Sequence, residues 1–89
     1  MKKTHVILGV HITDRLKNAV DVQKLLTEYG CNIKTRLGLH EISDDTCSMN
    51  GLLILEMVGD QIKSLELAAK LNEIEGIEVQ NMVFEHNNL

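Results

Sequence analysis

The sequence predicts a two-layer α+β domain, with a four-stranded antiparallel sheet and two helices on one of its faces. Strand-like and helical runs alternate in the order βαββαβ. Each helical run is also bracketed by an aspartate and a glycine, and Asp14 and Gly30 stand at the same separation as Asp60 and Gly76. This weak internal repeat predicts two βαβ units joined by a hairpin.

Hydrophobic alternation predicts strands at residues 4–12, 31–39, 51–58 and 77–84. In the first strand, two opposite sets of side chains follow from the period of two. One set is Val6, Leu8, Val10 and Ile12, and the other is His5, Ile7, Gly9 and His11. In the second, Ile33, Leu37 and Leu39 alternate with Lys34, Arg36 and His40.

Helical spacing of apolar residues predicts the two helices, at residues 14–30 and 61–74. Asp14 and Asp60 are suited to cap the amino ends, and Gly30 and Gly76 to end the helices. The apolar positions of the first helix are Ala19, Val22, Leu26 and Tyr29; those of the second are Leu65, Leu67, Ala68, Leu71 and Ile74. The wide second arc predicts a helix that lies flat on the sheet.

This arrangement is a ferredoxin-like sandwich, in which the second face of the sheet has no cover. The phase of the third strand is open. Glu56 favours Leu53, Leu55 and Met57 on the helix side, whereas the repeat, by matching Val58 with Ile12, favours the opposite set. Either phase brings large aliphatic residues to the uncovered face, together with some of Ile7, Met82 and Phe84. An exposed apolar patch predicts self-association, as a homodimer or homotetramer through that face or a sheet edge.

Composition restricts the functional classes. The 89 residues predict one domain, spanning 1–89 with a core at about 4–86, and the formal charge of −4 argues against direct nucleic-acid binding. No apolar run reaches the length of a membrane span, and no signal-peptide pattern opens the sequence. We therefore expect a cytoplasmic protein in which Cys31 and Cys47 are free thiols.

The stretch GLHEISDDTCSMNG, residues 38–51, raises the question of a metal site. His40 and Cys47 are ligands that nickel, copper or zinc prefer, and Asp44 and Asp45 could supply oxygen. Two such ligands are too few for a closed site, so a partner subunit or the other histidines would have to contribute. The alternative is a polar hairpin loop, in which Asp44, Asp45 and Asn50-Gly51 supply the turn, and the absence of a CxxC or HxH pair favours it.

Other candidate binding residues belong to the strands. His5 and His11 share one face of the first strand and, with His40, could converge on the open side of the sheet. The favoured alternative is that they are half-exposed polar residues of an interface. Arg36, expected on the uncovered face, could pair with a carboxylate ligand or with Glu56 on a neighbouring strand. No nucleophile elbow, P-loop, Rossmann glycine run or HExxH motif is present, so we expect no enzyme and no cofactor.

Four stretches carry a family resemblance: HITDRLKNAVDVQKLLTEYGCNI, RLGLH, GLLILEMVGD and LNEIEGIEVQNMVF. Over residues 6–84 the chain resembles the small ACT-like proteins of the iron-only hydrogenase system regulator type. The shared motifs are Arg36 and Gly38, Gly59-Asp60 and Gly76-Ile77. The resemblance implies a stand-alone regulatory module, a transcriptional regulator linked to hydrogenase maturation, that acts through a small effector or a protein partner.

Two positions depart from related patterns. Amino-acid-binding ACT domains carry Pro-Gly after Asp-Arg, where this sequence has Leu16 and Lys17. The regulatory domain of nickel-responsive repressors is similar in its second strand and loop, and His40 and Cys47 match members of its ligand set, but Gly38 stands where that set has another histidine. A metal-binding sensor or carrier is accordingly the alternative function.

Overall fold

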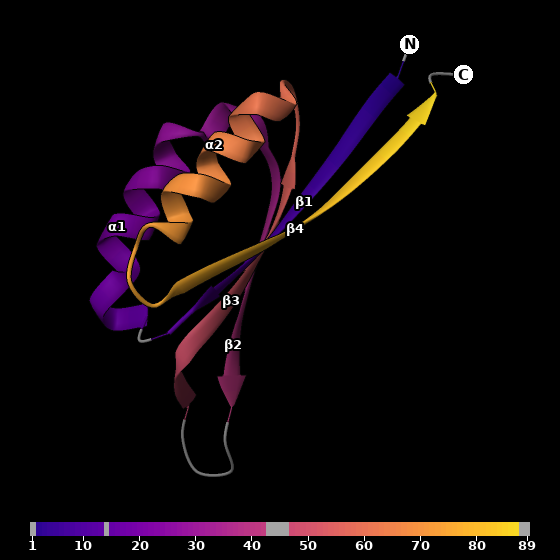
Figure 1. Ribbon diagram of the computed structural model, residues 1–89. Helices are drawn as coiled ribbons and strands as arrows, with labels where there is room; N and C mark the ends of the chain where they lie inside the picture. Colours follow the sequence, from indigo (N-terminus) through magenta and orange to yellow (C-terminus); the bar gives the residue numbers. More distant parts are fainter. Residues whose placement is uncertain (1, 14, 43–46, 88–89) are drawn as a thin grey trace.

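The computed structural model describes residues 2–13, 15–42 and 47–87, and the side chains of residues 4–13, 18–38 and 51–85. The elements are β1 (Lys2–Ile12), α1 (Arg15–Glu28), a 3₁₀ turn η1 (Gly30–Asn32), β2 (Ile33–Ile42), β3 (Cys47–Met57), α2 (Gln61–Asn72) and β4 (Ile77–Asn87). The strands form one antiparallel sheet in the order β2-β3-β1-β4, with both helices on one face (Figure 1). The ferredoxin-like, ACT-like fold is confirmed.

The signals around the second helix act as predicted. The Oδ1 atom of Asp60 accepts a hydrogen bond from the backbone amide of Ile62 at 2.9 Å, which caps α2. Gly76 follows the helix at a φ of 89°, a conformation that favours glycine. Asp14, the cap predicted for the first helix, lies outside the described residues. That helix ends at Glu28, and Gly30 opens the 3₁₀ turn η1 instead of an immediate strand.

The loop between β2 and β3 is shorter than the polar composition of this stretch suggests. β2 continues to Ile42 and β3 begins at Cys47, so most of residues 40–50 belong to the two arms of a hairpin. Ile42 pairs with Cys47, and a register shift separates this pair from that of His40 with Gly51. Asp44 and Asp45 lie outside the described residues. The hairpin is confirmed. The second strand was predicted to end too early, at residue 39, and the third to begin too late, at residue 51.

The register of β1 with β3 settles the phase of the third strand. Val6 pairs with Met57, Leu8 with Leu55 and Val10 with Leu53. Opposed residues share a face, so Leu53, Leu55 and Met57 lie toward the helices, as Glu56 indicated. The phase favoured by the repeat was wrong. The core joins these residues to apolar side chains of both helices, chiefly Val22, Leu26, Tyr29, Leu67 and Leu71. Leu65, assigned to the apolar arc of α2, is exposed instead.

The sheet is longer than the layer of helices that covers it. The molecule measures 50 × 25 × 17 Å, and the strands twist so that two arms leave the helical layer in different directions (Figure 1). One arm is the β2–β3 hairpin. The other consists of the outer ends of β1 and β4, where Lys2 pairs with Asn87, so both ends of the described chain lie together.

Candidate functional site

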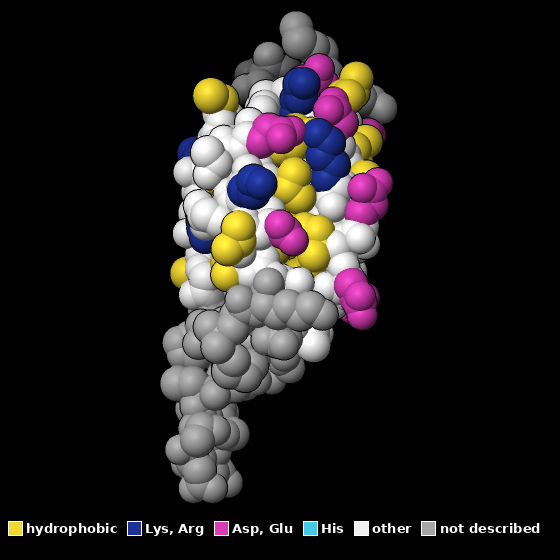
Figure 2. Space-filling view, turned by 90° about the vertical axis from the view of Figure 1, so that its left-hand side faces the viewer, with side chains coloured by type: hydrophobic (Ala, Val, Ile, Leu, Met, Phe, Trp, Pro, Cys, Tyr) yellow, Lys and Arg dark blue, Asp and Glu magenta, His cyan; other side chains and the backbone are white. Residues whose placement is uncertain are grey.

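The face of the sheet opposite the helices carries exposed apolar side chains. Leu37, Met82 and Phe84 lie on it, each about half exposed, and Ile7 and Ile54 lie between them in the register. The helix side differs: acidic and basic side chains are spread among the apolar atoms over both helices (Figure 2). The presence of Met82 and Phe84 on the uncovered face is confirmed.

A depression of about 290 Å³ lies on this face, and we call it the Gly9 hollow. Among the described residues, five from three adjacent strands line it: Gly9, His11, Leu52, Glu78 and Gln80. Gly9 pairs with Gln80, and His11 stands between Leu52 and Glu78. Because Gly9 has no side chain, its neighbours rise around an empty position in the middle of β1.

Neither backbone geometry nor crowding explains the glycine at this position. The described glycines with positive φ are Gly59 and Gly76, so Gly9 has an ordinary strand conformation. A Cβ atom on Gly9 would lie 3.8 Å from its nearest neighbour, the carbonyl oxygen of Gln80, which is an ordinary contact. Glycine within a strand lowers stability by about 0.5–1 kcal/mol relative to alanine. Such a glycine commonly marks a place where a ligand or another backbone approaches.

The rim of the hollow combines several chemical groups. Glu78 supplies a carboxylate, His11 an imidazole and Leu52 an apolar wall. The Nε2 atom of Gln80 donates a hydrogen bond to Oε2 of Glu78 at 3.1 Å, which fixes the amide beside the carboxylate. This arrangement suits a small polar molecule that has both hydrogen-bond donors and acceptors.

Among the predicted site residues, the structure brings His11 to the hollow and places His5 on the same face. His5 pairs with Phe84, six residues along β1 from the pair formed by His11 and Glu78. These histidines therefore share the open face, but they do not line one site. No group of three or more His, Cys, Asp or Glu side chains in the described part of the chain is arranged to hold a metal ion.

Arg36 does not lie on the open face, and this expectation was wrong. It pairs with Leu55, a core residue of β3, and its Nη2 atom donates to Oε1 of Gln23 in α1 at 3.1 Å. The hydroxyl of Thr35 donates to Oε1 of Glu56 at 2.9 Å, in the place considered for Arg36.

A register shift between Ile33 and Thr35 causes this change of face. It reverses the alternation within β2, so Ile33 lies on the helix side while Leu37 lies on the open side. Arg36 consequently lies toward the helices with Gly38.

The remaining candidates belong to the hairpin. The backbones of His40 and Cys47 are paired with those of Gly51 and Ile42, but their side chains, and all of Asp45, lie outside the described residues. Their use as metal ligands stays a prediction.

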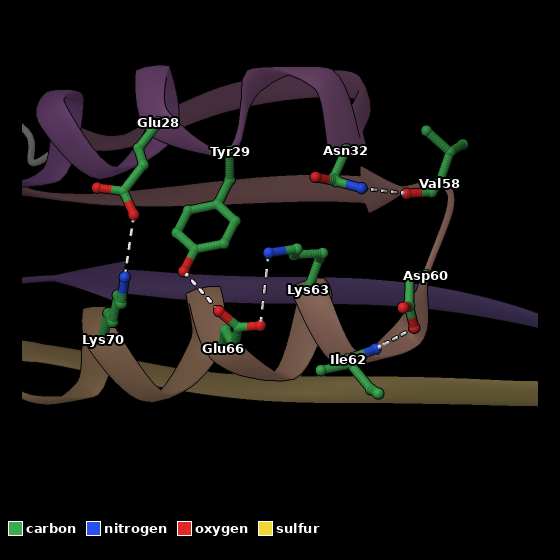
Figure 3. A network of polar contacts seen from close by, with 9 residues as sticks. All are labelled: Glu28, Tyr29, Asn32, Val58, Asp60, Ile62, Lys63, Glu66 and Lys70. Carbon is green, nitrogen blue, oxygen red and sulfur yellow. Dashed lines mark hydrogen bonds and ion pairs between the residues drawn. The ribbon is translucent and has the colours of Figure 1, made fainter.

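The helix side holds a network of polar contacts around Tyr29 (Figure 3). The Nζ atom of Lys70 donates to Oε2 of Glu28 at 2.9 Å and lies 5.1 Å from the centre of the Tyr29 ring. Tyr29 donates its hydroxyl hydrogen to Oε1 of Glu66 at 3.2 Å, and Lys63 pairs with Glu66. Hydrogen bonds with Tyr29 and Glu28 raise the pKa of Lys70 above its ordinary value. These contacts join the two helices.

Two wider depressions lie on this side. One, of about 760 Å³, has only residues of α1 among its described lining, so within the described part of the chain a single helix faces it. The other, of about 750 Å³, follows the groove between the helices, where Glu28 and Lys70 already satisfy one another. The Gly9 hollow is smaller, but three strands surround it, and we take it as the candidate site.

Sequence reasoning placed Gly9 and His11 on one face but missed the contribution of Glu78 and Gln80. The available signal was the glycine itself, which stands inside an alternating strand without any neighbouring turn residue. The pairing of β4 with β1 was needed to show which residues stand beside it.

Solved structures confirm the fold. An uncharacterized protein from Thermotoga maritima is 24% identical, with a TM-score of 0.77, over 94% of this chain and 99% of its own. A nitrogen regulatory PII-like protein from Thiomonas intermedia K12, bound to ADP, AMP and bicarbonate, is 10% identical, with a TM-score of 0.62, over 100% and 99%. The ACT domain of a GTP pyrophosphokinase from Chlorobium tepidum is 19% identical, with a TM-score of 0.50, over 99% and 90%.

No family model and no curated protein matches the sequence. At these identities the structural similarity defines the class of fold alone: a small ACT-like, ferredoxin-like domain. Within the described residues, neither helix is long and apolar enough to cross a membrane.

Proposed function

We propose that this protein is a stand-alone regulatory module that binds a small polar effector in the Gly9 hollow and responds through self-association. The observation that carries the proposal is Gly9 itself. It reduces the stability of a central strand without a conformational or steric need, and it leaves a depression that polar groups surround.

The neighbours in fold support a regulatory role. One is a PII-like protein bound to ADP, AMP and bicarbonate, and another is the ACT domain of a GTP pyrophosphokinase. We extend the principle of small-molecule sensing from them to this chain. A link to hydrogenase maturation, including a role in transcription through a protein partner, rests on the sequence resemblance, as does the expectation of a cytoplasmic protein without catalytic activity.

The dimensions of the hollow restrict the effector. A volume of about 290 Å³ is at the lower end of the range for ligand pockets and fits a molecule no larger than an amino acid. A nucleotide would need additional walls, which a second subunit could supply. The carboxylate of Glu78 favours an effector that presents a positive charge or a hydrogen-bond donor to it.

The exposed apolar residues of the open face and of the sheet edges support a response through self-association. An effector can shift an equilibrium between two assembly states only by its different affinity for them. A site on the same sheet as exposed apolar side chains is well placed for such coupling, because association changes its surroundings.

The test combines native mass spectrometry with calorimetry. The purified protein is titrated with the common amino acids, bicarbonate, AMP and ADP, and we expect saturable binding of one class. Gly9→Val fills the hollow and should weaken that binding by about tenfold or more, equivalent to about 1.4 kcal/mol. Fold stability should be retained, because valine favours strands.

Gly30→Ala is the control, because a Cβ at Gly30 meets nothing within 4 Å. It should leave binding unchanged. Binding that is the same in Gly9→Val as in the unaltered protein would remove the site. A protein that stays monomeric in light scattering at high concentration, with and without effector, would remove the mechanism.

A further inference from the structure

The outer edge of β4 has backbone groups that point away from the sheet. The amide of Ile77 donates to the carbonyl of Ile74 at 3.1 Å, and that of Val79 donates to Oδ1 of Asn72 at 2.9 Å. Both partners come from outside the sheet, so the odd-numbered residues of β4 turn their amides away from β1. In an antiparallel pair this direction alternates, so Asn81 and Val83 also point outward.

The protection of this edge stops at Val79. Asn72 is the last residue of α2, and in the described part of the chain no such side chain covers the edge at Asn81 or Val83. Beyond this point β1 and β4 continue past the helical layer (Figure 1). An unprotected strand edge is a template for another strand.

Three consecutive apolar side chains stand at this unprotected edge. Met82 is 52% exposed, Val83 40% and Phe84 51%. Met82 and Phe84 lie on the open face and Val83 on the other, as their pairing with Ile7, His5 and Val6 shows. Burial on only one face of the sheet would leave Val83 exposed, whereas an added strand would shield all three.

The opposite edge of the sheet is built differently. β2 carries Lys34 and Arg36, both exposed, and two register shifts interrupt it. Charged residues and bulges are devices that keep edge strands from pairing. β4 has no lysine, arginine or proline, and its register with β1 is continuous from Ile77 to Asn87. β4 carries Glu78 and Glu85, but residues 81–84 between them are uncharged, so the β4 edge is the better suited of the two to pair with a strand.

We propose that two copies of this chain pair through β4, antiparallel about a two-fold axis at Val83. In this register Val83 lies opposite Val83 of the partner subunit, and Met82 lies opposite Phe84 of the partner subunit. Val83 points its backbone groups outward, so the central pair exchanges two hydrogen bonds. The result is a continuous eight-stranded sheet with four helices on one side.

A second copy fits this edge because the segment is complementary to itself. A two-fold axis at Val83 sets each of the three apolar residues against an apolar residue, whereas an axis at Met82 would set Gln80 against the partner's Phe84. The charges are also compatible with an axis at Val83. Glu85 then lies opposite Asn81 of the partner subunit, so two carboxylates do not face one another.

This inference rests on the self-association in the proposed function and specifies its interface. Gln80 belongs both to β4 and to the Gly9 hollow. The partner's strand therefore runs beside one wall of the hollow, which gives assembly a direct path to the effector site.

Disulfide trapping tests the register. In a Cys31→Ser, Cys47→Ser background, Met82→Cys and Phe84→Cys are purified separately, mixed and oxidised. Opposed residues in a pair without mutual hydrogen bonds lie close enough for a disulfide. We expect a mixed dimer that joins the two variants and little product from either alone. Homodimers from one variant, or no cross-linked product, would overturn the proposal.

Charge substitution tests the interface. Val83→Lys should weaken dimerisation by about tenfold or more in analytical ultracentrifugation, because lysine opposes strand pairing. Leu37→Lys, on the opposite edge strand β2 and 52% exposed against 40% for Val83, should leave the dimer intact. Circular dichroism verifies folding of both variants.

The outcomes separate the two proposals. A monomeric unaltered protein contradicts the self-association in the proposed function. A dimer that survives Val83→Lys but is lost in Leu37→Lys contradicts only the β4 interface.

Discussion

Gly76 leaves no room for a side chain beside Asn18. A Cβ atom on Gly76 would lie 3.0 Å from Nδ2 of Asn18 and 3.3 Å from the carbonyl oxygen of Thr13. The same Nδ2 atom donates to that carbonyl at 2.9 Å, and the amide of Thr13 donates to the carbonyl of Gly76 at 2.8 Å. These contacts join the loop after β1 to the turn before β4.

Gly76→Ala should lower the free energy of unfolding by more than the left-handed backbone alone requires. A non-glycine residue at a φ of 89° costs about 1–2 kcal/mol, and displacement of Asn18 adds to this. Urea denaturation followed by circular dichroism measures the change. Gly30→Ala is the matched control, and it should alter stability little. Equal effects of the two substitutions would contradict the crowding at Gly76.

Asn18 and Ser64 occupy equivalent places in the repeat, four residues after Asp14 and Asp60, and both are buried. Asn18→Ala removes the partner of the Thr13 carbonyl and should destabilise the protein by about 1–3 kcal/mol. Ser64 has no side-chain hydrogen bond to another described residue. Ser64→Ala should therefore be neutral or stabilising, by about 1 kcal/mol. Thermal melts of both variants test the predicted opposite directions, and destabilisation by both would contradict this account.

The contact of Lys70 with Glu28 and Tyr29 predicts a dependence of stability on alkaline pH. The pKa of Lys70 is raised in the folded state, so its contribution is complete below 10.5 and is lost as the pH rises further. The difference in stability between the unaltered protein and Lys70→Gln should be small and constant from neutral pH to about 9, and should shrink above 10.5. Urea midpoints across this range measure it. A stability difference between the two proteins that grows as the pH rises would contradict this prediction.

The metal-binding alternative makes its own prediction. A site that uses His40 and Cys47 should retain nickel, copper, iron or zinc through mild purification and should lose it in His40→Ala and in Cys47→Ser. His5→Ala, which alters a histidine on β1, is the control. Elemental analysis by mass spectrometry measures the content, and uptake that neither hairpin variant changes would end this alternative.

Much of the fold could be predicted because its signals are local. The aspartates, the glycines and the two hydrophobic periods lie within single elements, so the order βαββαβ and the cap at Asp60 followed from residue chemistry. Glu56 even indicated the phase of β3, since a carboxylate is costly in a core. The conflicting repeat was less informative, because it compares positions and not burial.

The face occupied by Arg36 and the composition of the Gly9 hollow could not be predicted in the same way. A register shift of one residue reverses the alternation of a strand, and nothing in the side chains of Ile33 to Thr35 announces it. The hollow forms where Gly9 and His11 of β1 lie beside Glu78 and Gln80 of β4. These residues meet only because β1 and β4 are neighbours in the sheet, which the sequence pattern does not show.

The sequence by itself determined the element types, the core-facing residues of β1 and the presence of an uncovered apolar face, because these depend on local periodicity and burial. The tertiary structure alone decided the face on which Arg36 lies, the rim of the Gly9 hollow and the difference between the two sheet edges. These features depend on pairing between strands that are far apart in the chain. Such pairing is fixed by the packing of the whole sheet against its helices.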